Sequence, residues 1–156
     1  KHAIDMGASG IVAGSNLPDG QLDEGFLDKL MRCCEQVDFT YHRAFDVSSN
    51  PTDALNLLIK YKVPRLLTSG TFQTAWEGRH VLKQLLKLAE SKIIIMPGSG
   101  IKSENIAQLH ATLGAKEYHT SAKKIIKIKP MLIDSTDSIW ELNANEIINI
   151  KKILHQ

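Results

Sequence analysis

The feature that most constrains the fold of this chain is a repeat of short apolar segments, each followed by a stretch with helical periodicity. The segments begin at Gly10, Phe39, Arg65, Ile93 and Glu117, so consecutive starts are 29, 26, 28 and 24 residues apart. Each interval has room for a strand and a crossover helix. We therefore predict a βα unit repeated five times, with parallel strands and right-handed crossovers.

Amphipathic patterns fill the intervals between the apolar segments. They predict helices over residues 23–36, 53–62, 76–89 and 103–113, and a short helical segment that ends at Gly7 before the first strand. The regular pattern stops after residue 122. We expect one domain over residues 1–156, with the βα repeats in 1–122, an irregular excursion in 123–138 and a C-terminal helix in 139–156.

Two α/β architectures accommodate five such units: an open doubly wound sheet and a segment of a (βα)8 TIM barrel. An open fold of this size is expected to begin with its first strand, whereas here helical residues come first. Polar residues follow every apolar segment, and in a barrel all these strand ends meet at one mouth. Both observations favour a partial TIM barrel.

Composition narrows the classes of function. The chain has 156 residues, 43% of them hydrophobic, and a net charge of +2 with acidic and basic residues interspersed. These values predict a soluble cytoplasmic domain, without a nucleic-acid partner and without a membrane segment. Two adjacent cysteines, Cys33 and Cys34, fit neither a disulfide framework nor a zinc spacing.

The fourth apolar segment runs into the turn formed by Gly98, Ser99 and Gly100. Small residues allow close approach of the backbone to a ligand, and a helix that starts after the turn presents amide groups to an anion. A phosphate-binding turn is one interpretation. The alternative is a short strand-to-helix connection without a ligand.

Four motifs in register resemble the CutC family of copper homeostasis proteins. They are FTYHRAFD at 39–46, RLLTSG at 65–70, IMPGSGI at 95–101 and EYHTSA at 117–122. The resemblance implies a (βα)8 TIM barrel of which this chain covers strands four to eight. It also implies copper as the cargo, without an organic cofactor, and the cysteines that it implicates lie on early strands that this chain lacks.

In that register the last two turns follow strands seven and eight, where many TIM barrels bind phosphate. The candidate anion donors are the Gly98, Ser99 and Gly100 amides and the Ser121 hydroxyl, with Arg43 as a bidentate clamp.

The candidate catalytic residues are His42 and His119 as general acid and base, with Asp46 orienting one of them. A structural hydrogen bond is the alternative for each histidine. In an extended strand, His42 and Arg43 would point to opposite faces. Thr68 and Ser69 are expected to cap the following helix.

Two functions from different classes remain open. The first is a cytosolic CutC-type protein that handles Cu(I), although Cys34 falls on an apolar helical stripe and is expected to be a buried structural thiol. The second is an enzyme for a phosphorylated or otherwise anionic small molecule. Because a partial barrel exposes sheet edges, we also expect homo-oligomers. An oligomeric scaffold is a third interpretation.

Overall fold

The computed structural model describes residues 2–127 and 138–155. Its main sheet has four parallel strands that neighbour one another in chain order. The strands are β1 (Gly10–Ala13), β2 (Asp38–Tyr41), β3 (Arg65–Thr68) and β4 (Ile94–Pro97). The first four βα units predicted from the spacing are confirmed.

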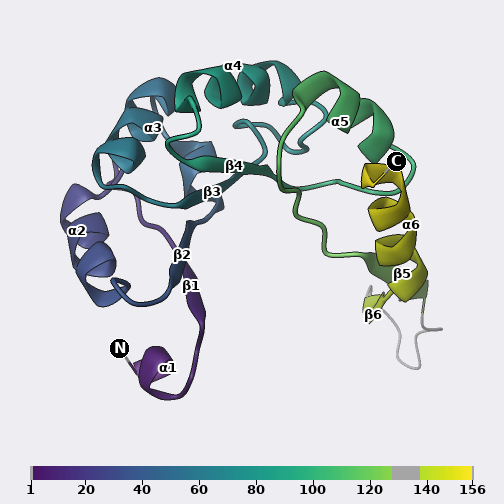
Figure 1. Cartoon of the computed structure of the whole chain (residues 1–156), viewed down its shortest axis with the longest axis horizontal. Coiled ribbons are helices and arrows are strands. Elements are labelled where there is room, and N and C mark those ends of the chain that lie inside the picture. The colour runs from purple at the N-terminus through teal and green to yellow at the C-terminus, as the bar shows by residue number, and fades with distance from the viewer. Residues whose placement is uncertain (1, 128–137, 156) are drawn as a thin grey trace, which may run out of the picture.

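The helices are α1 (His2–Asp5), α2 (Glu24–Cys33), α3 (Pro51–Lys60), α4 (Arg79–Ala89), α5 (Ile106–Leu113) and α6 (Ala144–Leu154), with a 3-10 helix, η1 (Arg43–Val47), after β2. Helices α2 to α5 lie on the outer side of an arc whose inner side is formed by the strands (Figure 1). No helix in the described ranges is long and apolar enough to cross a membrane.

Local sequence explains where several helices begin. The Asp23 carboxylate accepts the Phe26 amide at the start of α2, and the Asn50 side chain accepts two amides at the start of α3, where Pro51 occupies the first turn. Helix α5 begins at Ile106, three residues later than predicted, because residues 102–105 form a turn.

The fifth predicted strand is absent from the described residues. Residues 117–122 make one isolated parallel bridge, between Gly98 and His119, and otherwise run as irregular chain. The segment is instead held at its start by an ion pair: Arg65 contacts both carboxylate oxygens of Glu117, at 2.6 and 3.2 Å. Four of the five predicted parallel strands are therefore present in the described residues, and the prediction of the fifth is wrong.

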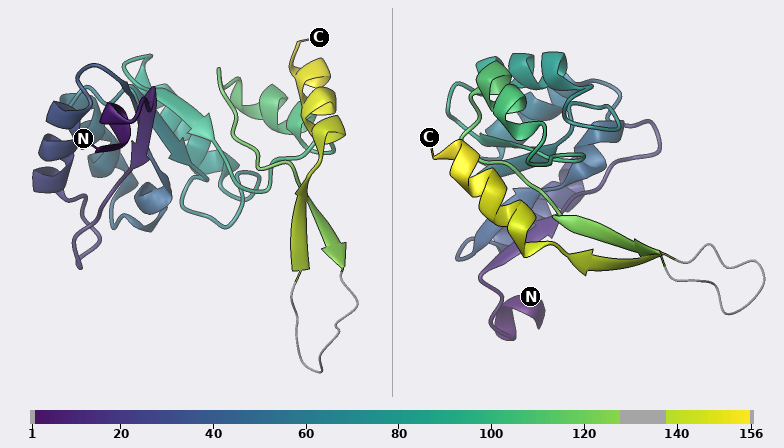
Figure 2. Two further views of the ribbon diagram at one scale, coloured as in Figure 1. Left: turned by 90° about the horizontal axis from the view of Figure 1, so that it is seen from below. Right: turned by 90° about the vertical axis from the view of Figure 1, so that its right-hand side faces the viewer.

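The C-terminal region also differs from the prediction. Residues 123–127 and 138 were expected to be irregular and residues 139–142 to be helical. They instead form an antiparallel hairpin of β5 (Lys123–Lys127) and β6 (Ser138–Leu142). The hairpin extends away from the body of the molecule (Figure 2). The rest of the predicted excursion, residues 128–137, lies outside the described residues.

The core lies between the sheet and the helices. Leu66 of β3 and Ile95 of β4 are buried against them, whereas Leu67 and Met96, one position along each strand, are only partly buried. The half-exposed face of β4 shows that the inner side of the arc is not covered by the described chain.

Candidate functional site

The turn after β4 has an unusual backbone. Ser99 has φ of +78° and Gly100 has φ of +69°, and the left-handed region is uncommon for a residue with a Cβ. Ser99 is held there by two contacts: its hydroxyl donates to the Gln73 carbonyl at 2.6 Å, and its carbonyl accepts the Ala75 amide at 3.0 Å. The loop after β3 therefore shapes the turn after β4.

The turn offers fewer anion donors than predicted. The Gly98 amide donates to the Thr68 carbonyl at 2.9 Å, so it is not available to a ligand. Within residues 2–127 and 138–155, the Ser99 and Gly100 amides donate to no protein acceptor. These two amides are the candidate donors that remain.

The turn before α5 already binds an internal carboxylate. Glu146 of α6 accepts the Ser103 amide at 2.6 Å and the Ser103 hydroxyl at 2.8 Å. Ser103 lies three residues before the first residue of α5, whose own amide, that of Ile106, donates to the Lys102 carbonyl at 2.9 Å. The Ser103 donors and the Ile106 amide are therefore not available to a bound phosphate.

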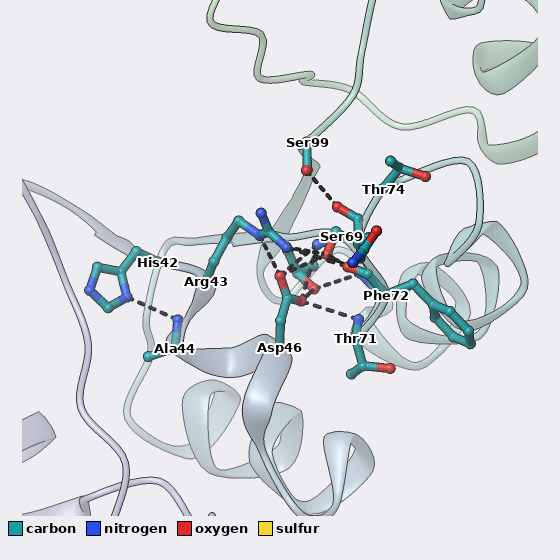
Figure 3. A network of polar contacts seen from close by, with 12 residues as sticks. His42, Arg43, Ala44, Asp46, Ser69, Thr71, Phe72, Thr74 and Ser99 are labelled. Atoms are coloured by element: carbon teal, nitrogen blue, oxygen red, sulfur yellow. Dashed lines mark hydrogen bonds and ion pairs between the residues drawn. The ribbon is translucent and has the colours of Figure 1, made fainter. Parts of the chain in front are cut away.

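A buried carboxylate organises the loops after β2 and β3 (Figure 3). Asp46 accepts hydrogen bonds from Arg43 Nε, the Thr68 hydroxyl, the Ser69 amide and hydroxyl, and the Thr71 amide. The structure thus contradicts two expectations. Asp46 orients no histidine in the described chain, and Thr68 and Ser69 bind Asp46 rather than cap a helix.

Opposing effects act on the pKa of Asp46. Burial, the largest effect, raises it, but hydrogen bonds from Thr68, Arg43 and Ser69 together outweigh burial and bring the pKa below the ordinary value of 3.8. Asp46 is therefore an ionised structural anchor at neutral pH and a poor candidate for a proton donor.

The two candidate histidines lie in different surroundings. His42 is the N-cap of η1, where its Nδ1 accepts the Ala44 amide at 3.1 Å. This contact is the structural alternative named for His42. The His119 backbone amide donates to the Pro97 carbonyl, and its side chain lines a cavity at the carboxyl ends of the strands.

This cavity has a volume of about 750 Å³, within the usual range for small-molecule sites. It brings together five predicted site residues: Arg43, Ser99, Gly100, His119 and Ser121. Three others do not line it, namely His42, Gly98 and Asp46. Arg43 lines the cavity and His42 does not. The expected opposition of the two side chains along an extended strand does not apply, because β2 ends at Tyr41 and Arg43 is the first residue of η1.

Several cavity residues were missed by the sequence analysis. Lys102, Lys123, Lys124, Trp140 and Glu146 all line the same cavity. The alternation of lysine and isoleucine from residue 123 was a signal for a strand, but it did not reveal that residues of the hairpin line this cavity. Nothing local marks Glu146 as a partner of the turn before α5.

The described residues do not form a metal centre. No group of three or more His, Cys, Asp or Glu side chains in these ranges is arranged to hold a metal ion. Cys33 is exposed and Cys34 is buried, and burial raises the pKa of the Cys34 thiol, which opposes formation of the thiolate that a metal requires. Cys34 fits the predicted structural role.

Comparison with known proteins places this arrangement in a family. The sequence model of the CutC family matches residues 1–124. The chain belongs to the CutC family. A CutC family protein of Parabacteroides distasonis is 39% identical over 125 residues, which cover 80% of this chain and 51% of that protein. The human copper homeostasis protein cutC homolog is 38% identical over 75% of this chain and 43% of its own length.

A longer match comes from the CutC family protein of Histophilus somni, which is 35% identical over 99% of this chain and 67% of its own length. The crystal structure of the putative copper homeostasis protein CutC from Streptococcus agalactiae superposes with a TM-score of 0.69 at 24% identity, over 75% of this chain and 58% of that chain. The match supports a shared fold. The chain spans about half the length of several CutC relatives.

Proposed function

We propose that this chain contributes strands four to eight of a CutC-type (βα)8 barrel that handles Cu(I) in copper homeostasis in the cytosol. The observation that carries the proposal is the family match over residues 1–124. Parallel strands with helices on one side of the arc are compatible with part of a barrel wall. The single bridge between Gly98 and His119 lies where the last strand would complete that wall.

The described residues do not themselves fit a Cu(I) site. Cu(I) prefers thiolate and thioether ligands, and the two thiols present differ sharply in exposure and are neighbours in sequence at the C-terminal end of α2. The copper ligands are therefore proposed to come from other parts of the full-length protein. This chain would supply the scaffold.

A competition titration with a chromophoric Cu(I) chelator tests this proposal on the full-length protein. We expect stoichiometric Cu(I) uptake that is unchanged when Cys33 and Cys34 are both replaced by serine. Absence of uptake by the wild-type protein would overturn the copper function. Loss of uptake in the double variant would instead assign the site to α2.

A second function is favoured by the cavity at the mouth of the sheet. Arg43, the Ser99 and Gly100 amides and the Ser121 hydroxyl are proposed to bind a small anion, with His119 as the acid or base of an enzyme acting on it. His42 has a lesser role in this proposal because its ring nitrogen caps η1.

Isothermal titration of the full-length protein with inorganic phosphate tests the anion site. Arg43→Gln is expected to weaken binding about tenfold, the effect of losing one charged hydrogen bond. Arg32→Gln is the control, since Arg32 is an exposed residue of α2 paired with Asp28. Equal weakening by both variants would show only a general charge effect and would contradict the site.

We also propose that the protein forms homo-oligomers. Strand β1 lies at an edge of the sheet, and Val12 on it is 62% exposed. Light scattering on the 156-residue chain is expected to give a mass above that of a monomer. A monodisperse monomer with cooperative thermal unfolding would contradict this expectation.

A further inference from the structure

The hairpin of β5 and β6 forms one wall of the cavity at the mouth of the sheet. Trp140 and Ile125 line the cavity together with residues from the ends of β3 and β4, such as Leu67 and Ser99. Figure 2 shows the hairpin extending from the body of the molecule. The cavity thus has a second side that the βα repeats do not provide.

This wall carries a large apolar surface. Ile125 and Trp140 are cross-strand partners, so both side chains project from the same face of the ribbon, and they are 54% and 52% exposed. An aromatic ring and an isoleucine that face a cavity form a surface on which a planar apolar group can stack. An inorganic anion such as phosphate has no apolar group that could pack on this surface.

Cations surround the apolar wall. The Lys123 ammonium lies 4.8 Å from the centroid of the Trp140 ring, and Lys102 and Lys124 line the same cavity. None of these three lysines takes part in an ion pair within residues 2–127 and 138–155. The surroundings favour a negatively charged ligand.

The carboxylates of the cavity do not cancel this charge. Four cationic side chains line it, against two carboxylates, Glu104 and Glu146. Glu146 already accepts two hydrogen bonds from Ser103. The Arg43 side chain, although paired with Asp46, is 42% exposed and reaches the cavity.

We propose that the cavity binds a small phosphate ester that carries an aromatic ring. The ring lies against Trp140 and Ile125, and the phosphate is held by Arg43 and the Ser99 and Gly100 amides. The inference rests on the proposed anion site and names the class of ligand for it. The inference is based on the placement of the two kinds of surface: the apolar side chains lie on the hairpin, and the hydrogen-bond donors lie on the turns.

The experiment compares inorganic phosphate with phenyl phosphate, titrated into the full-length protein by calorimetry. Stacking of one ring on an aromatic side chain is worth about 1–3 kcal/mol, so phenyl phosphate is expected to bind about tenfold or more tightly. In Trp140→Ala the two affinities are expected to become nearly equal. Leu142→Ala is the control, because Leu142 is an exposed residue of the same strand outside the cavity lining.

The outcomes separate this inference from the proposed function. Phosphate binding without preference for phenyl phosphate, or a preference that survives Trp140→Ala, overturns the inference and leaves the anion site. Absence of binding for both ligands overturns both.

If Trp140→Ala fails to fold, wild-type protein decides the question by NMR. Nuclear Overhauser effects between the phenyl protons and the Trp140 indole are then expected. Their absence in a saturated complex overturns the inference.

Discussion

Replacing Asp46 by asparagine tests the claim that this carboxylate anchors the loops around the cavity. Asparagine keeps the shape of the side chain but has one acceptor oxygen in place of two. With that oxygen at the Oδ1 position, it still accepts from Thr68, Thr71 and the Ser69 amide, but it faces Arg43 and the Ser69 hydroxyl with an amide nitrogen.

The size of the effect follows from burial. The Asp46 side chain is 7% exposed, and hydrogen bonds to a charged group contribute about 1.5–3 kcal/mol each. Arg43 is 42% exposed, so its share is reduced to about 1 kcal/mol or less. We expect Asp46→Asn to lower the free energy of unfolding by about 2–4 kcal/mol at neutral pH.

The effect should depend on pH. The folded-state pKa of Asp46 lies below its ordinary value of 3.8, because hydrogen bonds outweigh the opposing effect of burial. Its stabilising contribution is therefore complete above that value and is lost as the pH falls through the folded-state pKa. The difference between wild type and Asp46→Asn should shrink below about pH 4.

Urea unfolding of the full-length protein at neutral and acidic pH measures this difference. Asp5→Asn is the matched control, since Asp5 is exposed on α1 and makes no hydrogen bond within the described chain; it should change stability by less than about 0.5 kcal/mol. The reasoning is refuted if Asp46→Asn is as stable as wild type at pH 7, or if the difference grows as the pH falls.

Three further changes test other contacts. Glu117→Gln should lower the free energy of unfolding by about 1 kcal/mol in urea titrations, because it weakens the two-point contact with Arg65. Gly78→Ala should cost at least about 3 kcal/mol by the same measurement, because a Cβ there overlaps backbone of the loop after β3, whereas Gly25→Ala on α2 should be neutral or stabilising. Burial raises the Tyr41 pKa to about 12, so stability should fall as the pH rises from 10 through that value, and the loss should be smaller in Tyr41→Phe.

The first four βα units were predictable because their signals are local. Apolar segments of similar spacing, Asp23 and Asn50 as helix caps, and Gly7 at a helix end are all visible in a short window of sequence. The fifth strand was not predictable in this way. Residues 117–122 are suited to a strand, but pairing depends on a distant neighbour, and the chain makes only one bridge there.

The C-terminal error has a different cause. Ile139 and Leu142 are spaced three apart, which fits a helical stripe, and the strand signal in residues 123–127 has its partner beyond a segment without clear periodicity. The same residues thus fit both a helix and a strand of a two-stranded ribbon. The pairing of Leu142 with Lys123 and of Ile139 with Ile126 shows that they form a strand.

The candidate site was predictable in its location but less so in its membership. Polar residues at the strand ends correctly marked the mouth of the sheet, as parallel topology requires. The sequence does not show which polar groups are already hydrogen-bonded within the protein. Asp46 and Gly98 were therefore named as site residues, although the Asp46 carboxylate and the Gly98 amide are hydrogen-bonded to protein groups. Trp140 was not predicted as a site residue, because it belongs to the hairpin, which the sequence analysis did not predict.

The contact between Glu146 and Ser103 joins a segment that the family's sequence model matches to one that the model does not match. Ser103 lies inside the part of the chain that the family's sequence model matches, and Glu146 lies beyond it. A chimera that exchanges the C-terminal region with that of another CutC protein must therefore deliver a carboxylate to the same position. Otherwise the transplanted tail leaves a backbone donor without its acceptor, and the graft carries a folding defect that neither parent has.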